Sequence, residues 1–412
     1  MDPRPRSDFF AFLAARFSLR VLPGFFVCPE GGDLDPMGKA YDGRGGFGST
    51  VRGATRSQGA RAVKSRIASG WLAVVALAMA ACSGSGAAAP KSSATADRPS
   101  GARSAASAKA APSAGCRGDA AGLAAGEEKT TITSGGVERW YLRHVPPAHD
   151  ITKPLPVVVD LHGYTEGAVV HARQSDLGAF GDRHGFVTIT PQGLGAVARW
   201  EAALGSADVK FIGDLLDRVE QTVCVDTARV FFTGLSNGAM MTSVVACALA
   251  DRVAAVAPVA GITDVAGCKP ALRVPIVAFH GTADPFLAYD GGLGPSVAKL
   301  PAPDGSGKTL GELGARNRPK GPSVPDVLRS WARRNGCTGQ ASEKHIAADV
   351  TELSFACPAG ADVELFRVEG GGHSWPGSAF SKQIEAVVGP TTDSISADEV
   401  MWTFFQAHPL TR

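Results

Sequence analysis

Short apolar runs alternate with amphipathic stretches along most of the chain. The runs have the length and composition of buried strands. They lie at 156–161, 185–190, 228–233, 253–259, 274–279 and 363–368, and a further strand is expected at 138–145. Residues 209–219 carry apolar side chains on one helical face, and 323–335 predicts a helix with Pro325 in its first turn and Gly336 after its end. The alternation predicts an α/β fold, a mostly parallel sheet with helices on both faces and sites at the carboxyl ends of its strands.

The first quarter of the chain lacks this alternation. Residues 71–82 form an apolar stretch behind several basic residues, which is typical of a signal sequence and shorter than the roughly 18 residues of a membrane span. We expect the signal sequence at 63–82. Because such a sequence should begin its chain, we interpret residues 1–62 as a non-native or disordered extension, with Val63 as a candidate start.

The end of the predicted signal sequence indicates a lipid anchor. Small residues precede Cys82, as in a bacterial lipoprotein signal whose cysteine is lipidated, although Met79 stands where leucine is usual. Ordinary cleavage nearby, which would give a freely secreted protein, stays open. Residues 83–115 are almost all Ala, Ser, Gly, Pro and Lys and predict a disordered linker, so one catalytic domain is expected at 116–412.

Charge limits the kinds of partner. The chain has 412 residues with 41 basic and 39 acidic side chains, a formal net charge of +2. The basic residues are concentrated before position 110 and leave no basic stripe in the domain. Nucleic acid is therefore excluded as a partner. The predicted signal sequence places the domain outside the cytoplasm, where membrane contact is expected only through the lipid anchor. We expect a monomer.

A serine stands in a G-x-S-x-G pattern between a predicted strand and a predicted helix. Ser236 lies in the segment 234–238, after the apolar run 230–232 and before Ala-Met-Met. This pattern predicts a nucleophile elbow, in which a strained turn exposes the serine Oγ. A serine attacks an acyl carbon only when a base removes its proton and a carboxylate orients that base.

Two later motifs supply the base and the acid in the order of α/β-hydrolases. His373 follows three glycines after the last predicted strand, and Asp284 precedes Pro285 after the strand 274–279. We prefer this aspartate to Asp290 and to two other carboxylates, Asp264 and Asp362. The order Ser, Asp, His therefore predicts a catalytic triad that needs no cofactor or metal.

Other residues complete the predicted site. The backbone N–H groups of Asn237 and Tyr164 are the expected oxyanion donors, and His162 is expected to hold its own turn. Trp200 and Trp375 could contact an apolar acyl group or pack in the core. The Gly/Pro-rich segment 290–322 is expected to be a surface loop, with a border of the substrate cleft as the sharper alternative.

These motifs together resemble a known family. The segments 161–164, 208–211, 234–238, 255–261, 279–284 and 371–377 are similar to those of secreted polyhydroxybutyrate depolymerases and feruloyl or acetylxylan esterases. These enzymes are carbohydrate-esterase-family-one-like α/β-hydrolases, and the resemblance covers about 116–408. It implies a triad of Ser236, Asp284 and His373. Ala207 stands where the family often has an acidic residue, which leaves the triad untouched.

The cysteines fit an exported domain. The chain has eight cysteines, and six remain without Cys28 and Cys82. An even number in an exported domain predicts disulfides rather than a metal site, since no Cys-x-x-Cys pattern is present. The resemblance implies a bond between Cys337 and Cys357. The other pairings stay open, and the candidates are Cys247 with Cys268 and Cys116 with Cys224.

The sequence therefore predicts an exported serine esterase that acts through an acyl-enzyme. The expected substrate is an ester of a polymer, an oligomer or the plant cell wall, and a soluble or accessible ester is favoured over a crystalline polymer. Ester rather than amide hydrolysis follows from the resemblance alone. The alternative is a lipid-anchored binding protein that keeps the hydrolase fold without turnover.

Overall fold

The apolar runs become the central strands of one mixed sheet. The structure is a computed structural model that describes residues 110–117, 123–147, 150, 153–315 and 319–411. The strands are β1 Gly126–Ser134, β2 Val137–Val145, β3 Leu155–Leu161, β4 Val187–Pro191, β5 Val225–Leu235, β6 Ala255–Val259, β7 Ile276–Gly281, β8 Thr338–Ala347, β9 Val350–Ala356 and β10 Val363–Val368. They lie in the order β1-β2-β4-β3-β5-β6-β7-β10-β9-β8.

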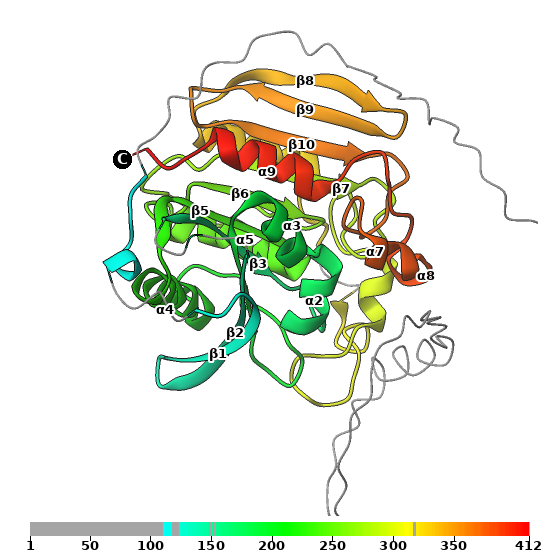
Figure 1. Cartoon of the computed structure of the whole chain (residues 1–412). Coiled ribbons are helices and arrows are strands. Elements are labelled where there is room, and N and C mark those ends of the chain that lie inside the picture. The colour runs from blue at the N-terminus through cyan, green and yellow to red at the C-terminus, as the bar shows by residue number, and fades with distance from the viewer. Residues whose placement is uncertain (1–109, 118–122, 148–149, 151–152, 316–318, 412) are drawn as a thin grey trace, which may run out of the picture. The chain divides into compact units, whose positions relative to one another are not determined.

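The middle of this sheet is parallel and its two ends are antiparallel. Strands β4, β3, β5, β6, β7 and β10 pair in parallel. The pairs β1/β2, β2/β4, β10/β9 and β9/β8 are antiparallel. Figure 1 shows β8 and β9 at one end of the sheet and β1 and β2 at the other. The prediction of a mostly parallel sheet is confirmed.

Helices connect the strands and cover the sheet. They are η1 Ala114–Arg117, α2 Gly167–Ser175, α3 Leu177–His184, α4 Ala207–Thr222, α5 Asn237–Ala248, η3 Pro295–Lys299, α6 Val324–Arg334, α7 Ala379–Gln383, α8 Glu385–Val388 and α9 Ala397–Ala407. The predicted helix at 323–335 corresponds to α6, and the side chain of Ser323 caps it by accepting from the Asp326 N–H.

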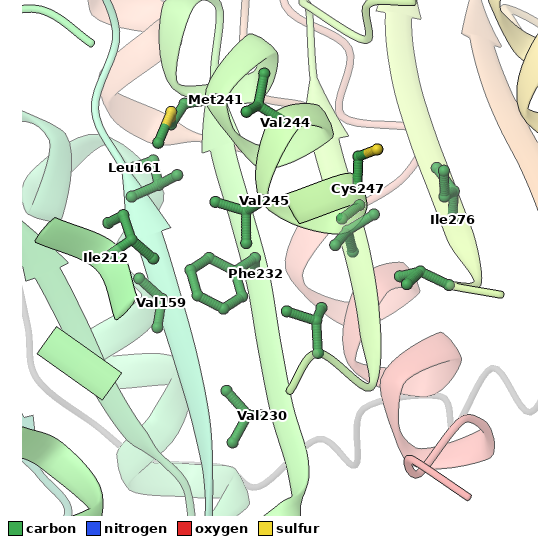
Figure 2. Packing of buried hydrophobic residues seen from close by; sticks show 14 of the residues in the cluster. Val159, Leu161, Ile212, Val230, Phe232, Met241, Val244, Val245, Cys247 and Ile276 are labelled. Atoms are coloured by element: carbon green, nitrogen blue, oxygen red, sulfur yellow. The ribbon is translucent and has the colours of Figure 1, made fainter. Parts of the chain in front are cut away.

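Side chains alternate between two cores along each central strand. Phe232 belongs to the cluster packed against α4, α5 and α6, and Phe231 belongs to the cluster packed against α3 and α9. In Figure 2, Phe232 of β5 lies beside Val245 of α5, and Val159 of β3 lies near Ile212 of α4. Both faces of the sheet are therefore buried, which is why the central strands are mostly apolar.

The chain packs on the sheet earlier than predicted. Pro112 forms a bridge with Asp226, the Ser113 N–H donates to the Val225 carbonyl at 2.9 Å, and the Ala111 N–H donates to the Asp226 carboxylate at 2.8 Å. The linker predicted to extend through residue 115 therefore ends before residue 111. The predicted extension 1–62, the signal sequence 63–82 and the lipidation site Cys82 lie outside the described residues.

The strand order and the position of the serine turn are those of the α/β-hydrolase fold. Each parallel strand from β3 to β10 ends at one edge of the sheet, and the connections that follow β3, β5, β7 and β10 meet there. In such folds this edge holds the active site. Within the described residues, no helix is long and apolar enough to cross a membrane.

Candidate active site

The predicted site residues follow strands that end at the same edge. Ser236 comes directly after β5, Asp284 three residues after β7, and His373 five residues after β10. Tyr164 follows β3, the neighbour of β5. Because all these strands are parallel, residues from four distant parts of the chain are placed on one side of the sheet.

Ser236 lies in a strained turn between β5 and α5. Its φ of 57° and ψ of −115° are unusual for a residue other than glycine, and its N–H donates to the Val259 carbonyl at 2.9 Å. The turn needs glycine two residues later, since a Cβ on Gly238 would lie 1.9 Å from the Leu161 carbonyl oxygen. The side chain of Ser236 is partly exposed. This is the nucleophile-elbow geometry that the pattern predicted.

Asp284 and His373 form a buried pair. His373 Nδ1 lies 2.7 Å from Asp284 Oδ2, and each residue is 6% exposed. The N–H groups of Phe286 and Leu287 donate to the other oxygen, Oδ1, at 2.7 and 2.9 Å. Burial raises the pKa of Asp284, but His373 and His280 outweigh it and lower the pKa below its usual range. Asp284 is therefore an ionised carboxylate aimed at one nitrogen of His373.

The competing carboxylates occupy other environments. Asp290 is exposed, Asp264 pairs with Arg334 on α6, and Asp362 lies 2.6 Å from His408 Nε2. Among the predicted acids, Asp284 is the one that the fold brings to His373.

A second histidine supports the acid. His280 Nε2 lies 2.8 Å from the Leu287 carbonyl and 3.3 Å from Asp284 Oδ2. The ring of Phe286 lies 4.9 Å from that of His373. No role was predicted for His280, and its contact with Asp284 indicates that it helps to hold the acid of the pair.

The backbone N–H groups of Asn237 and Tyr164, the predicted oxyanion donors, have no acceptor within the described residues. Asn237 is the first residue of α5, so its N–H has no carbonyl partner within the helix. Within the described part of the chain, the Tyr164 N–H also donates to no protein acceptor. A Cβ placed on Gly163 would lie 3.7 Å from Ser236 Cβ, so the turn at 163–164 lies directly beside the serine.

The segment after Pro285 contacts this turn. The Tyr164 hydroxyl donates to the Pro301 carbonyl at 2.8 Å. Residues 290–315 and 319–322 form no strand, only η3 and isolated bridges such as Pro301 with Thr309. The expectation of a surface loop therefore fits, and its contact with Tyr164 supports the sharper alternative, a border of the cleft.

His162 is a buried, neutral residue of the core. Its Nδ1 lies 2.7 Å from the Gly163 carbonyl, and its Nε2 accepts from the Gly193 N–H at 2.9 Å. Burial lowers the pKa of His162 to about 4, so the ring is uncharged at neutral pH. The expected role of this side chain in holding its own turn agrees with these bonds.

Both tryptophans are buried and hydrogen-bond to residues near the site. Trp200 is 2% exposed, its indole N–H donates to the His162 carbonyl at 2.9 Å, and its backbone bonds the Asn237 side chain in both directions. Trp375 is 1% exposed and donates to Asp398 at 2.9 Å. Substrate contact was one expectation for these residues, but their burial favours the packing alternative.

A buried group of charges behind Tyr164 was missed by the sequence analysis. It consists of Asp160, Glu166 and His171, of which Asp160 and His171 are fully buried. One sequence feature could have indicated it, because Asp160 is a carboxylate inside the otherwise apolar run of β3. An interior carboxylate requires a cationic or hydrogen-bonding partner.

Three disulfides join the six cysteines of the domain. They are Cys116–Cys224, Cys247–Cys268 and Cys337–Cys357. These are the pair that the resemblance implied and the two candidate pairs. Structural disulfides are typical of proteins in oxidising compartments outside the cytoplasm.

Sequence comparisons connect the chain with esterases. No protein-family model matches it. Feruloyl esterase B of Piromyces equi is 34% identical over 40% of this chain and 29% of its own length. A bifunctional acetylxylan esterase/xylanase of Neocallimastix patriciarum is 28% identical over 35% of this chain and 22% of its own length. The match therefore spans less than a third of either relative.

One further sequence relative and one solved structure are also similar to the chain. A poly(3-hydroxyalkanoate) depolymerase of Paucimonas lemoignei is 33% identical over 29% of this chain and 30% of its own length. Among solved structures, an acetyl xylan esterase from Aspergillus awamori aligns with a TM-score of 0.47 at 14% identity, over 68% of this chain and 99% of that one. The sequence relatives carry the names that the motif resemblance predicted.

Proposed function

We propose that this chain, a relative of feruloyl esterases, acetylxylan esterases and a poly(3-hydroxyalkanoate) depolymerase, is an exported serine hydrolase of carboxylic esters. The observation that carries the proposal is the buried 2.7 Å pair of His373 and Asp284 at the sheet edge where Ser236 lies in a strained elbow. A binding protein without turnover would have no use for a serine, a histidine and an aspartate in this order.

Acylation begins at Ser236. Its Oγ attacks the ester carbonyl while His373 Nε2 takes the hydroxyl proton, and the C–O bond to the leaving alcohol breaks as the same nitrogen returns that proton. Asp284 holds the proton of the ring on Nδ1, which leaves Nε2 free to act as the base. The N–H groups of Asn237 and Tyr164 stabilise the oxyanion of the tetrahedral intermediate.

Deacylation reverses these roles with water. His373 activates a water molecule that attacks the acyl-enzyme, and Ser236 leaves with the proton that the histidine took from that water. The products are a free carboxylic acid and the regenerated serine. The ionised state of Asp284 stabilises the imidazolium in both half-reactions because its charge lies against Nδ1.

The substrate is an ester of the kinds for which the relatives are named: a feruloyl ester, an acetylated polysaccharide or a hydroxyalkanoate. The contact of Tyr164 with Pro301 supports a cleft wall formed by the segment after η3. The three disulfides support export, and lipidation at Cys82 remains part of the proposal for the precursor.

A fluorophosphonate probe tests this function. The wild-type protein should be labelled, and Ser236→Ala should not, because the probe phosphonylates only a serine activated by its base. Ser243→Ala is the matched control, since this serine lies on the same helix with its hydroxyl bonded to the Ala239 carbonyl. Labelling that persists in Ser236→Ala, or a wild-type protein that neither labels nor hydrolyses p-nitrophenyl esters, would refute the proposal.

A further inference from the structure

Three side chains of alternating charge lie next to the turn that contains Gly163 and Tyr164. Asp160 comes from β3, His171 from α2, and Glu166 from the turn between them. His171 Nε2 lies 2.6 Å from Asp160 Oδ1, and His171 Nδ1 forms an ion pair with Glu166 Oε2 at 3.2 Å. The second oxygen of Asp160 accepts from the Ser175 hydroxyl at 2.6 Å. The histidine thus stands between two carboxylates.

The outer carboxylate closes the turn beside the serine. Glu166 Oε2 accepts from the Gly163 N–H at 2.7 Å, and the Glu166 N–H donates to the Gly163 carbonyl at 3.3 Å. Between them, Thr165 has a φ of 71°, which is unusual for a β-branched residue. The side-chain bond from Glu166 therefore helps to hold a strained turn whose second residue is Tyr164.

Electrostatics make the three side chains one unit. Burial lowers the pKa of His171, but Asp160 and Glu166 outweigh it and raise the pKa to about 10. Burial raises the pKa of Glu166, and His171 outweighs that in turn and lowers it. At neutral pH the His171 ring is therefore a cation that lies between the two carboxyl groups. Removing that cation would leave two carboxylates together in the interior, where uncompensated charge is strongly unfavourable.

The same helix also contacts the loop that carries His373. The ring of Trp375, two residues after His373, meets the His171 ring edge-on at 5.8 Å. Gln174, also on α2, donates to the Ser381 hydroxyl at 3.1 Å, and the Trp375 N–H donates to that hydroxyl at 3.2 Å. Helix α2 therefore lies against both the turn of Tyr164 and the histidine loop.

We propose that His171 and Glu166 are positioning residues, which fix the Gly163–Tyr164 turn so that the Tyr164 N–H points at the oxyanion. This inference rests on the proposed function. Glu166 acts through its bond to the Gly163 N–H, and His171 acts by holding the Glu166 carboxylate in place with the support of Asp160. Neither side chain is expected to touch the substrate.

Four variants test the inference through kcat. The initial burst of p-nitrophenol gives the concentration of active sites, and the steady-state rate is divided by that concentration. Removing an oxyanion donor costs about 10²–10³ in kcat, so displacing it through His171→Gln or Glu166→Ala should cost about tenfold or more. KM should change little, because the donor acts on the transition state. Glu166→Gln keeps an oxygen acceptor and should recover most of the loss. The double variant His171→Gln/Glu166→Ala should be no slower than the slower single variant.

The inhibition constant of a trifluoromethyl ketone gives an independent readout. This inhibitor forms a tetrahedral oxyanion on Ser236, so its binding should weaken by the same factor as kcat/KM. His144→Gln is the matched control, since this partly buried histidine pairs with Asp182 at 2.8 Å on another part of the sheet and should leave both values unchanged. If His171→Gln does not fold, the comparison of Glu166→Ala with Glu166→Gln carries the test.

The outcomes separate this inference from the proposed function. Unchanged kcat and unchanged ketone binding in His171→Gln and Glu166→Ala, with an active wild-type enzyme, would overturn the inference alone. Losses that multiply in the double variant would also overturn it, because the two residues would then act separately. A wild-type protein without hydrolysis would instead overturn the proposed function.

Discussion

Replacing Asp284 with asparagine tests how the acid directs His373. Asp284 Oδ1 accepts two backbone N–H groups, from Phe286 and Leu287, which cannot turn away. In Asp284→Asn the amide oxygen must therefore take this position, and the amide nitrogen must face His373 Nδ1. That nitrogen is a donor, so the ring is forced to accept at Nδ1 and to carry its proton on Nε2.

The magnitude follows from this change of tautomer. A ring protonated on Nε2 cannot remove the proton of Ser236, and the same substitution in serine proteases lowers kcat by about 10⁴. This corresponds to about 5.5 kcal/mol of transition-state stabilisation. The fold should change little, because asparagine keeps the two backbone bonds at Oδ1.

Steady-state hydrolysis of a p-nitrophenyl ester measures this effect, and circular dichroism checks the fold. Asp290→Asn is the matched control: this exposed residue was the second candidate acid, and the variant should keep wild-type kcat. A kcat of Asp284→Asn within about tenfold of wild type would refute the reasoning, since it would mean that the carboxylate does not set the tautomer. An equal loss in Asp290→Asn would refute it as well.

Three further predictions concern stability, all measured by urea unfolding. Burial raises the pKa of Asp398 from 3.8 to about 7, so the folded state binds this proton more tightly and wild-type stability falls as the pH rises from about 4 through 7. Asp398→Asn should match wild type at pH 4 and exceed it by about 1–2 kcal/mol at pH 8, and equal stability at both pH values would contradict this. Replacing Cys116 and Cys224 by serines opens a loop with a sequence separation of 108 and should lower the free energy of unfolding by about 4–5 kcal/mol. The same replacement of Cys337 and Cys357, with a separation of 20, should lower it by about 3 kcal/mol. The reverse order would argue against the entropic account. Gly238→Ala should prevent folding, because its Cβ would lie 1.9 Å from the Leu161 carbonyl oxygen. Gly213→Ala is the control: its Cβ meets open space on α4, and the variant should gain about 0.5–1 kcal/mol in free energy of unfolding. A folded Gly238→Ala would contradict the packing of the elbow.

The central fold was predictable because burial on both faces makes the parallel strands largely apolar. Strands β1, β8 and β9 are antiparallel strands at the ends of the sheet, and the sequence pattern did not predict them. β1 and β8 lie at the two edges of the sheet, their residues are mostly exposed, and stretches such as Gly126–Ser134 are polar. Their pairing is decided by the neighbouring strand rather than by a local pattern.

The candidate site was predictable where a motif fixes the backbone. Ser236 and His373 stand in glycine-rich turns that only particular sequences allow, and Asp284 follows a strand at a known place in the chain order. Asp160 inside the apolar run of β3 indicates that a buried partner is needed, but the identity of that partner was not predictable, because the packing of α2 on β3 brings His171 and Glu166 to it. The burial of both tryptophans likewise depends on tertiary contacts.

The most direct test of the central claim is to trap the acyl-enzyme. The protein is mixed with a p-nitrophenyl ester, quenched in acid during the burst, digested and analysed by mass spectrometry. We predict that one acyl group is found on the peptide that contains Ser236, and that Ser236→Ala shows none. An acyl group on another residue would contradict the claim that Ser236 is the nucleophile. Turnover of the ester by the wild-type protein with no acylated peptide would contradict it as well.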